Sequence, residues 1–331
     1  MVTIAINGFG RIGRQAFRAA WGNKNVKVVA INDLTDTVTL AHLLKYDTAY
    51  GTWPNDISSD KENLIVDGKK IPVLAEKDPT LLPWKKFKVD VVLECTGRFT
   101  THEGGEMHIH AGAKKVIISA PAKGGVPTYV MSVNSDDVKD EQSAIINNAS
   151  CTTNCISPVM LVLQERFGIE KAMMTTVHGY TADQNLQDGP HRDLRRARAA
   201  AENIVPTTTG AAVATTEVIP ELQGNFDGLA IRVPVTTVSL SDITALLNKE
   251  VTTEQINEAF VKAAKESRFK GILTTTSELL VSSDFIGNTH SAIVDLSLTN
   301  VVGGTMVKVV AWYDNEAGYA TRLIEMAREI M

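Results

Sequence analysis

The chain has 331 residues, of which 44% are hydrophobic and 21% charged, and its 33 basic and 38 acidic side chains give a formal net charge of −5. This composition excludes a disordered chain, a collagen-like repeat and a disulfide-rich miniprotein. The length is typical of about two domains, and the slightly acidic balance argues against a dedicated nucleic-acid binder.

The first half of the chain alternates short apolar runs with helical patterns. Strands are predicted at residues 2–7, 26–32, 89–95 and 115–119, and helices at 11–21, 38–45 and between the last two strands. A hairpin is expected where residues 63–66 and 70–74 flank Asp67-Gly68, because this pair readily takes the positive φ values of a type I′ turn. Apolar strands separated by helices favour a parallel sheet covered on both faces.

The pattern changes after about Asn148. Strands are predicted at residues 172–178, 229–233, 237–247, 292–298 and 306–313, and helices at 152–167, 254–266 and 316–331. One face of the second helix carries Ile256, Ala259, Phe260 and Ala263, which we expect to be buried. Strands with fewer intervening helices indicate a second, mixed or antiparallel domain.

A glycine motif marks a dinucleotide site. Gly8, Gly10 and Gly13 form G-x-G-x-x-G between the first strand and the first helix, where a pyrophosphate can meet free backbone N–H groups. Asp33 lies about 20 residues further on, where a carboxylate accepts from a ribose hydroxyl and repels a 2′-phosphate, which favours NAD over NADP. The alternative is a glycine-rich turn with Asp33 capping the next helix.

This motif and the strand pattern together predict an α/β fold with two domains. Residues 1–150 would form a Rossmann-type doubly wound sheet that binds NAD, with the helix at 316–331 packing back on it. Residues 151–315 would form a mixed or antiparallel α+β catalytic domain.

The three cysteines indicate a nucleophile and argue against a disulfide framework and a zinc site. Cys95, Cys151 and Cys155 are too few for a disulfide framework, and no Cys/His spacing is typical of a zinc site, so no metal is expected. Cys151 begins a predicted helix, whose dipole would lower the pKa of its thiol. A structural role is the alternative for Cys151, and Cys155 is expected to be a small buried residue.

Activation of that thiol requires a base. His178 ends a β-branched run just before a glycine, where its side chain can face a cleft. Solvated or capping roles are expected for the other six histidines, which are His42, His102, His108, His110, His191 and His290.

Arginines and hydroxyls suggest a phosphate site. Arg192, Arg195, Arg196 and Arg198 precede the run Pro-Thr-Thr-Thr-Gly at residues 206–210, and Arg232 ends an apolar strand. Hydroxyls, backbone N–H groups and arginines are typical ligands of phosphate. The alternative for the arginine cluster is a solvated or subunit-facing helix face.

The motifs in this order identify a family. INGFGRIGR, INDLTD, ECTGRF, NNASCTTNC, TTVHGYTADQ, HRDLRRARAAAENIVPTTTGAA and WYDNEAGYATR occur along the chain, which resembles the phosphorylating glyceraldehyde-3-phosphate dehydrogenases over essentially its whole length. The resemblance implies NAD-dependent oxidation and phosphorylation of glyceraldehyde 3-phosphate to 1,3-bisphosphoglycerate through a cysteine thioester, in glycolysis or gluconeogenesis. It also implies a homotetramer, with residues 179–201 at a subunit interface.

The resemblance assigns roles residue by residue. It implies that Cys151 is the nucleophile and His178 its base. The implied ligands of inorganic phosphate are Ser150, Thr152, Thr209 and Gly210. Those of the substrate phosphate are Thr181, Arg196 and Arg232, with Arg198 as a rival of Arg196. The implied cofactor residues are Gly8, Gly10, Arg11, Ile12, Gly13, Asp33, Lys77, Thr96, Gly97, Ser119, Asn315 and Tyr319.

Other activities remain as alternatives. An erythrose-4-phosphate dehydrogenase on the same scaffold would hydrolyse the thioester, and aspartate-semialdehyde or N-acetylglutamyl-phosphate reductases share the two-domain organisation. A regulatory or RNA-binding relative without catalysis is a further alternative. No apolar run approaches the ~20 residues of a membrane helix, and the chain opens without a signal-peptide pattern, so we expect a cytoplasmic protein.

Overall fold

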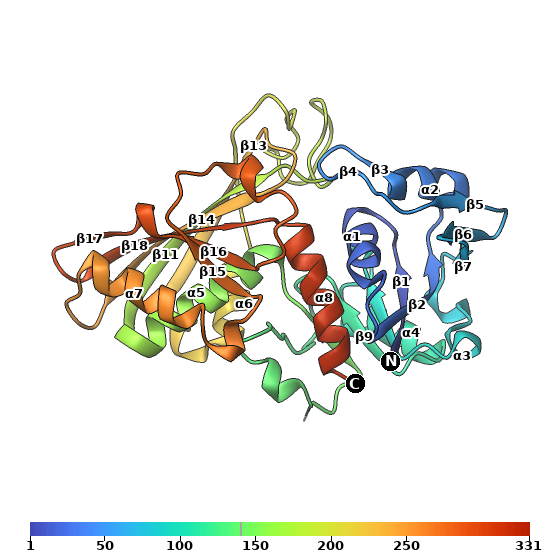
Figure 1. Cartoon of the computed structure of the whole chain (residues 1–331), viewed down its shortest axis with the longest axis horizontal. Coiled ribbons are helices and arrows are strands. Elements are labelled where there is room, and N and C mark those ends of the chain that lie inside the picture. The colour runs from blue at the N-terminus through green and yellow to red at the C-terminus, as the bar shows by residue number, and fades with distance from the viewer. Residues whose placement is uncertain (140) are drawn as a thin grey trace. The chain divides into compact units, whose positions relative to one another are not determined.

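The computed structural model describes residues 1–139 and 141–331 and divides into two compact units. The first unit comprises Met1–Tyr129, Asn134–Ala149 and Ala320–Met331, and the second comprises Val130–Val133 and Ser150–Tyr319. Colour in Figure 1 follows the chain, so the last helix, α8 (Ala317–Glu329), is red although most of it belongs to the first unit, whose strands are mainly blue and cyan.

The first unit is built around one eight-stranded sheet. Its other elements are β1 (Val2–Asn7), α1 (Arg11–Ala20), β2 (Val26–Asn32), α2 (Thr37–Lys45), β3 (Tyr46–Asp47), β4 (Gly51–Thr52), β5 (Ile57–Ser59), β6 (Asn63–Val66), β7 (Lys69–Leu74), α3 (Trp84–Phe87), β8 (Val91–Glu94), α4 (His102–His110), β9 (Lys115–Ile118) and β10 (Ile145–Asn147). The strand order is β10-β9-β8-β1-β2-β7-β6-β5. Pairing is parallel from β10 to β7, which confirms the predicted parallel sheet, and antiparallel from β7 to β5.

The predicted hairpin is confirmed. β6 and β7 pair from Asn63–Pro72 to Val66–Lys69. Asp67 and Gly68 between them have φ values of 48° and 74°. These two positive values are those that a type I′ turn requires.

The second unit contains the mixed sheet. Its elements are α5 (Cys151–Phe167), β11 (Ile169–Gly179), β12 (Val205–Thr207), α6 (Ala211–Val218), β13 (Phe226–Val233), β14 (Ser239–Leu247), α7 (Thr253–Ala263), β15 (Leu273–Thr276), β16 (Ala292–Asp295), β17 (Asn300–Val302) and β18 (Met306–Tyr313). The order is β12-β13-β11-β14-β18-β16-β15, with β17 on β18. β11 is parallel to β13 and antiparallel to β14, which confirms a mixed sheet. The predicted apolar face of α7 is buried.

One predicted strand is too long. The strand expected at residues 292–298 ends at Asp295, because the Asp295 carboxylate accepts from the Ser297 N–H and starts a 3-10 helix at Leu296–Leu298. The arginine segment at residues 192–198, for which a helix face was the alternative to a phosphate site, consists of bends and turns. Further 3-10 helices lie at Pro79–Leu81, Ser135–Lys139, Pro220–Leu222, Ser267–Phe269 and Ser282–Phe285.

Neither a membrane-spanning helix nor a metal-binding cluster occurs in residues 1–139 and 141–331. No helix there combines the length and the apolar character that crossing a membrane requires. In the same residues, His, Cys, Asp and Glu side chains form no group of three that could hold a metal ion.

Candidate active site

The glycine motif forms a tight loop between β1 and α1. Gly8 has a φ of 92°, and a Cβ added there would lie 2.8 Å from backbone atoms of Cys95 and Thr96. A Cβ at Gly13 would lie 2.1 Å from the Gly8 carbonyl oxygen, whereas one at Gly10 would meet nothing within 4 Å. The first and third glycines therefore permit close packing, and the second leaves the loop open to a ligand.

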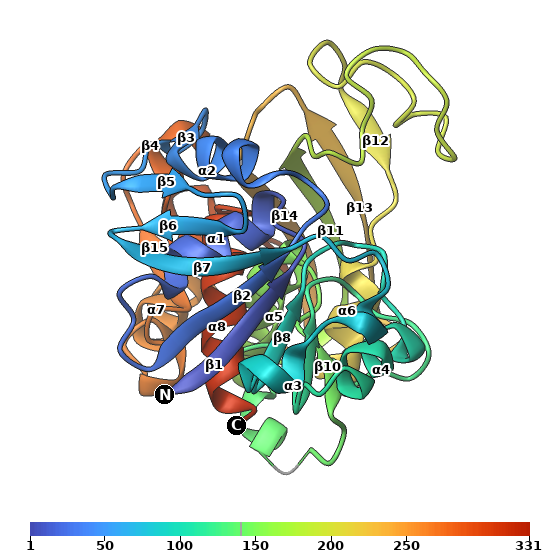
Figure 2. The ribbon, with the colours of Figure 1, turned by 90° about the vertical axis from the view of Figure 1, so that its right-hand side faces the viewer.

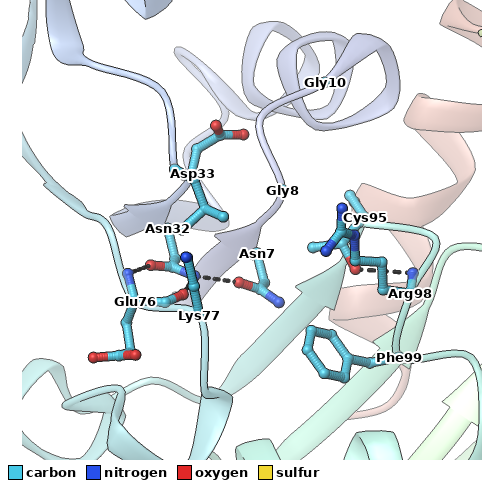
Figure 3. A pocket seen from close by; sticks show the side chains of 12 residues that line it. Asn7, Gly8, Gly10, Asn32, Asp33, Glu76, Lys77, Cys95, Arg98 and Phe99 are labelled. Carbon is cyan, nitrogen blue, oxygen red and sulfur yellow. Dashed lines mark hydrogen bonds between the residues drawn. The ribbon is translucent and has the colours of Figure 1, made fainter.

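A cavity of about 470 Å³ lies against this loop (Figure 3). Five predicted cofactor residues line it, which are Gly8, Gly10, Asp33, Lys77 and Thr96. Asp33 accepts from the Phe9 N–H at 2.7 Å and from the Thr35 N–H at 2.9 Å, so its carboxylate is fixed beside the glycine loop. Asp36, not Asp33, caps α2, so the capping alternative is wrong.

The other predicted cofactor residues do not line this cavity. Arg11, Ile12, Gly13, Gly97 and Ser119 belong to the first unit, where Arg11 donates to Asp47 at 2.6 Å. Asn315 and Tyr319 belong to the second unit, and the Asn315 side-chain oxygen accepts from the Ser239 hydroxyl at 3.0 Å.

A buried polar network, which sequence reasoning missed, supports the cavity wall. Asn32 Nδ2 donates to the Asn7 side-chain oxygen at 2.7 Å, and Asn32 Oδ1 accepts from the Glu76 N–H at 2.9 Å (Figure 3). Asn7 in turn donates to Glu94 at 2.5 Å. These bonds link the carboxyl ends of β1, β2 and β8, where doubly wound sheets bind their ligands.

His108 completes this network, so the solvated or capping role expected for it is wrong. Its side chain is fully buried, with Nε2 3.1 Å from Glu94 and Nδ1 3.0 Å from the Trp84 indole nitrogen. Because an indole N–H can only donate, Nδ1 is the acceptor and Nε2–H faces the Glu94 carboxylate. The sequence signal was the helical position of His108, which puts it on the side of α4 that is buried.

Cys151 is the first residue of α5 and faces His178. The Ser150 hydroxyl caps the helix by accepting from the Thr153 N–H at 3.1 Å, and Ala149 before it has a φ of 52°. Cys151 Sγ lies 3.4 Å from His178 Nε2, at the end of β11. The structure therefore brings together the predicted nucleophile and base.

Arg232 lies behind the histidine because β11 and β13 pair His178 with Arg232 in register. His178 Nδ1 is 2.6 Å from the Gly179 carbonyl oxygen, to which Arg232 Nη1 also donates at 3.1 Å. The Gly179 oxygen can only accept, whereas Arg232 Nη1, 2.7 Å from Nδ1, can only donate, so the two contacts of Nδ1 call for opposite tautomers of the ring. The tautomer with its proton on Nδ1 is the one that leaves the Nε2 lone pair facing the thiol. Arg232 also adds a positive charge beside the ring.

Burial sets the charge state of this pair. Burial raises the pKa of the Cys151 thiol, and the Arg232 charge and hydrogen bonds from Thr152 lower it by less. Burial and, second, the charge of Arg232 lower the pKa of His178 to about 3. The predicted lowering of the Cys151 pKa is therefore wrong, because the loss of water around the sulfur outweighs the effect of the helix end.

Tyr313 is a second residue that sequence reasoning missed. Its hydroxyl lies 2.9 Å from that of Thr152 and 2.8 Å from that of Thr176, and its ring meets His178 edge to face at 6.0 Å. These contacts fix the first turn of α5 against β11 and β18. The Thr152 hydroxyl is thereby engaged, so its backbone N–H is the group left to meet an anion.

The predicted phosphate ligands lie in the same unit. Both candidate arginines pair with a carboxylate, Arg196 with Asp183 and Arg198 with Asp188. Arg196 alone also donates to the threonine run, to the Thr207 hydroxyl at 2.8 Å and to the Thr208 carbonyl at 3.0 Å. Arg232 Nε is buried without a partner among the described residues, so its N–H is available to donate to an anion.

The remaining predicted ligands lie on turns. Gly210 precedes α6, and the Thr209 hydroxyl accepts from the Ala211 N–H at 3.2 Å. The Thr181 hydroxyl accepts from the Asp183 N–H at 3.4 Å. The helices α5 and α6 touch through Ser157 and Thr215 at 3.2 Å, within two turns of both N-termini, whose N–H groups attract anions.

The other two cysteines are unreactive. Cys155 is fully buried, as predicted, and burial raises the pKa of its thiol. Burial also raises the pKa of Cys95 to about 12. Neither thiol can supply a thiolate near neutral pH.

Comparison with known proteins identifies the family of this chain. The family model "Glyceraldehyde 3-phosphate dehydrogenase, NAD binding domain" matches residues 2–102, and "Glyceraldehyde 3-phosphate dehydrogenase, C-terminal domain" matches residues 150–315. Glyceraldehyde-3-phosphate dehydrogenase of Geobacillus stearothermophilus is 55% identical over 99% of this chain and 98% of its own. Glyceraldehyde-3-phosphate dehydrogenase 1 of Bacillus cereus is 54% identical over 99% of this chain and 98% of its own. Glyceraldehyde-3-phosphate dehydrogenase of Streptomyces coelicolor is 52% identical over 98% of this chain and 97% of its own.

Proposed function

Since the chain belongs to the glyceraldehyde-3-phosphate dehydrogenase family, we propose that Cys151 and His178 are its catalytic pair and that Arg232 binds an anionic group of the substrate. The protein is an NAD-dependent oxidoreductase that acts on glyceraldehyde 3-phosphate. The observation that carries the proposal is the 3.4 Å approach of Cys151 Sγ to His178 Nε2.

The pair performs the covalent step. His178 Nε2 accepts the thiol proton as Cys151 Sγ bonds to the aldehyde carbon, and the protonated ring then donates to the new oxyanion. The N–H groups at the start of α5 add to this stabilisation. NAD, when bound, supplies the hydride acceptor. Cys151 then holds the acyl group as a thioester, which inorganic phosphate attacks, releasing an acyl phosphate and the thiol.

Two sets of groups would hold the phosphates. Arg232, Arg196 and Thr181 would bind the phosphate of the substrate and so orient its aldehyde. The attacking phosphate would meet Ser150, Thr152, Thr209 and Gly210 at the N-termini of α5 and α6. The buried, unpartnered Arg232 Nε supports the first assignment.

Initial rates of NADH formation test this reaction. With glyceraldehyde 3-phosphate and NAD, we expect turnover to depend strictly on inorganic phosphate, because phosphate releases the acyl group from Cys151. Equal rates without phosphate would mean that water hydrolyses the thioester, as in the erythrose-4-phosphate alternative. Such a result would overturn the proposed phosphate site.

The Asp33→Gly variant tests the ribose assignment. The loss of the carboxylate removes repulsion of a 2′-phosphate, so we expect the kcat/KM ratio of NAD to NADP to fall by about tenfold or more. Asp36→Gly, which removes a neighbouring carboxylate outside the cavity, serves as the control and should leave the ratio unchanged. An unaltered ratio in Asp33→Gly would exclude this residue from ribose recognition.

We further propose a cytoplasmic homotetramer in which the first unit is the NAD-binding domain and the second the catalytic domain. The segment 179–201 carries Leu186 and Leu194, which are 80% and 81% exposed in the single chain. Large exposed apolar side chains of this kind mark an interaction surface. The mass of the protein in solution, by sedimentation, tests the tetramer.

A further inference from the structure

A second cavity of the first unit lies where β2 and β7 separate. The two strands pair only at Ile31–Val73 and Asn32–Leu74. The start of β7 pairs with β6 and diverges from β2 (Figure 2). The cavity between them has a volume of about 850 Å³ and shares no lining residue with the cofactor cavity. It lies beside Val26 and Val28 at the start of β2, whereas the cofactor cavity lies at the end of that strand.

Trp21 and Trp53, two of the four tryptophans of the chain, line this second cavity, which we call the tryptophan cavity. Trp21 and Trp53 have ring centroids 6.5 Å apart at an interplanar angle of 74°, and Trp21 stacks on Phe17 at 5.4 Å. Phe17 is fully buried, so this contact anchors Trp21 to the core. Anchored, partly exposed indoles provide rigid faces on which planar rings stack.

Cations surround the same rings. The Lys69 ammonium lies 5.4 Å from the Trp21 centroid, and the Arg18 guanidinium lies 5.6 Å from that of Trp53. Lys27 and Lys70 also line the cavity. Arg18 Nη2 donates to the Leu44 carbonyl at 2.6 Å, and Arg18 Nε is buried without a partner among the described residues.

Little negative charge opposes these cations. The only lining carboxylate among the described residues is Asp67, which accepts from Asn55 at 2.7 Å and from the Trp21 indole at 2.9 Å. Those two bonds lower the pKa of Asp67, so it is ionised and already bonded at neutral pH. Lys70 pairs with Asp60 at 2.7 Å, Asp47 lies near Arg18, and Asp67 lies near Lys69. The four lining cations still outnumber these three carboxylates.

We propose that the tryptophan cavity binds a nucleoside monophosphate. The base would stack on the indole of Trp53, because Trp21 is already stacked on Phe17 and has Lys69 over its ring. The phosphate would pair with Lys69 and Lys27 at the rim. Aromatic faces with flanking cations recognise the two parts of a nucleotide, its π surface and its phosphate. The volume is within the range of small-molecule sites. The site is separate from the dinucleotide cavity, so both are filled at once.

Titration of AMP into the NAD-saturated holoenzyme tests this, with tryptophan fluorescence and calorimetry as readouts. NAD blocks the cofactor cavity, so we expect a saturable change with one AMP per chain. Adenosine lacks the phosphate and ribose 5-phosphate lacks the base, so each should bind about tenfold more weakly or worse. Loss of AMP binding under saturating NAD would overturn the proposal, as would tighter binding of a short oligoadenylate than of AMP.

Charge-matched variants locate the site. Lys69→Glu should weaken AMP binding by about tenfold or more, because it reverses the charge beside Trp21. Lys61→Glu makes the same change at an exposed lysine outside the cavity and should leave AMP affinity unaltered. Trp53→Phe keeps an aromatic ring against Phe17 but should weaken AMP binding and reduce the fluorescence change.

The dehydrogenase reaction provides the independent readout. The rate of NADH formation and the affinity for NAD should be unchanged in Lys69→Glu, because Lys69 lies outside the cofactor cavity. Unaltered AMP affinity in both Lys69→Glu and Trp53→Phe would overturn the proposal. An equal loss in the Lys61→Glu control would also overturn it, since the effect would then be one of net charge.

Discussion

The Cys151→Ser variant is expected to lose turnover by at least about 10⁴-fold, the scale seen when a catalytic nucleophile is removed. A serine hydroxyl is far less acidic than a thiol, so it passes its proton to His178 far less readily and remains a poor nucleophile. The initial rate of NADH formation with substrate and phosphate measures this loss. NAD affinity should stay within about twofold, because Cys151 does not line the cofactor cavity.

Cys155 provides the matched control. It lies one turn further along α5, fully buried, with its sulfur 3.9 Å from the Ala311 carbonyl oxygen. Cys155→Ser makes the same atomic replacement in the same helix away from His178, so most of the turnover should remain. Turnover of Cys151→Ser near that of the unaltered protein would remove Cys151 from the catalytic role. Equal losses in both variants would mean that damage to α5, not loss of the nucleophile, explains the result.

The local parts of the site could be predicted from the sequence. Gly8, Gly13 and Asp33 lie within a single strand–helix–strand unit, so their spacing alone places them together. Cys151 was likewise predictable as a helix start, because Ser150 is a strong capping residue.

The long-range parts could not be predicted. His178 meets Arg232 only because β11 and β13 pair in one particular register, and no local pattern specifies the register of strands more than 40 residues apart. Tyr313 reaches Thr152 from the far end of the chain. His108 has an ordinary helical position, and only the packing of Trp84 and Glu94 around it makes it buried.

The charge state of Cys151 likewise depends partly on the local sequence and partly on long-range packing. The sequence specifies the helix end, which stabilises a thiolate, but the packing determines how much water the sulfur loses. Burial has the larger effect on the pKa of this thiol. Proton transfer to His178 would place opposite charges 3.4 Å apart, and their attraction would offset part of that burial.

The His178→Asn variant tests this coupling through pH. In the unaltered protein, the thiol can pass its proton to Nε2, so the thiolate is stabilised by the imidazolium that forms. An asparagine accepts no proton, so the thiol must lose its proton to solvent without that ion pair. The midpoint of Cys151 alkylation by iodoacetamide should therefore move to higher pH, and turnover should fall by about 10²–10⁴-fold, as when a general base is lost.

We also expect the His178→Asn variant to change the pH dependence of the free energy of unfolding, independently of catalysis. His178 has a folded-state pKa of about 3 against an ordinary value of 6.5, so the unfolded chain binds the extra proton between these values. Stability from this group is present above pH 6.5 and is lost as the pH falls toward 3. His178→Asn should therefore lose less unfolding free energy between pH 7 and 4 than the unaltered protein. An unshifted alkylation profile would show that His178 is not the partner of Cys151, and an unaltered acid dependence would show that its imidazole is not held neutral by burial beside Arg232.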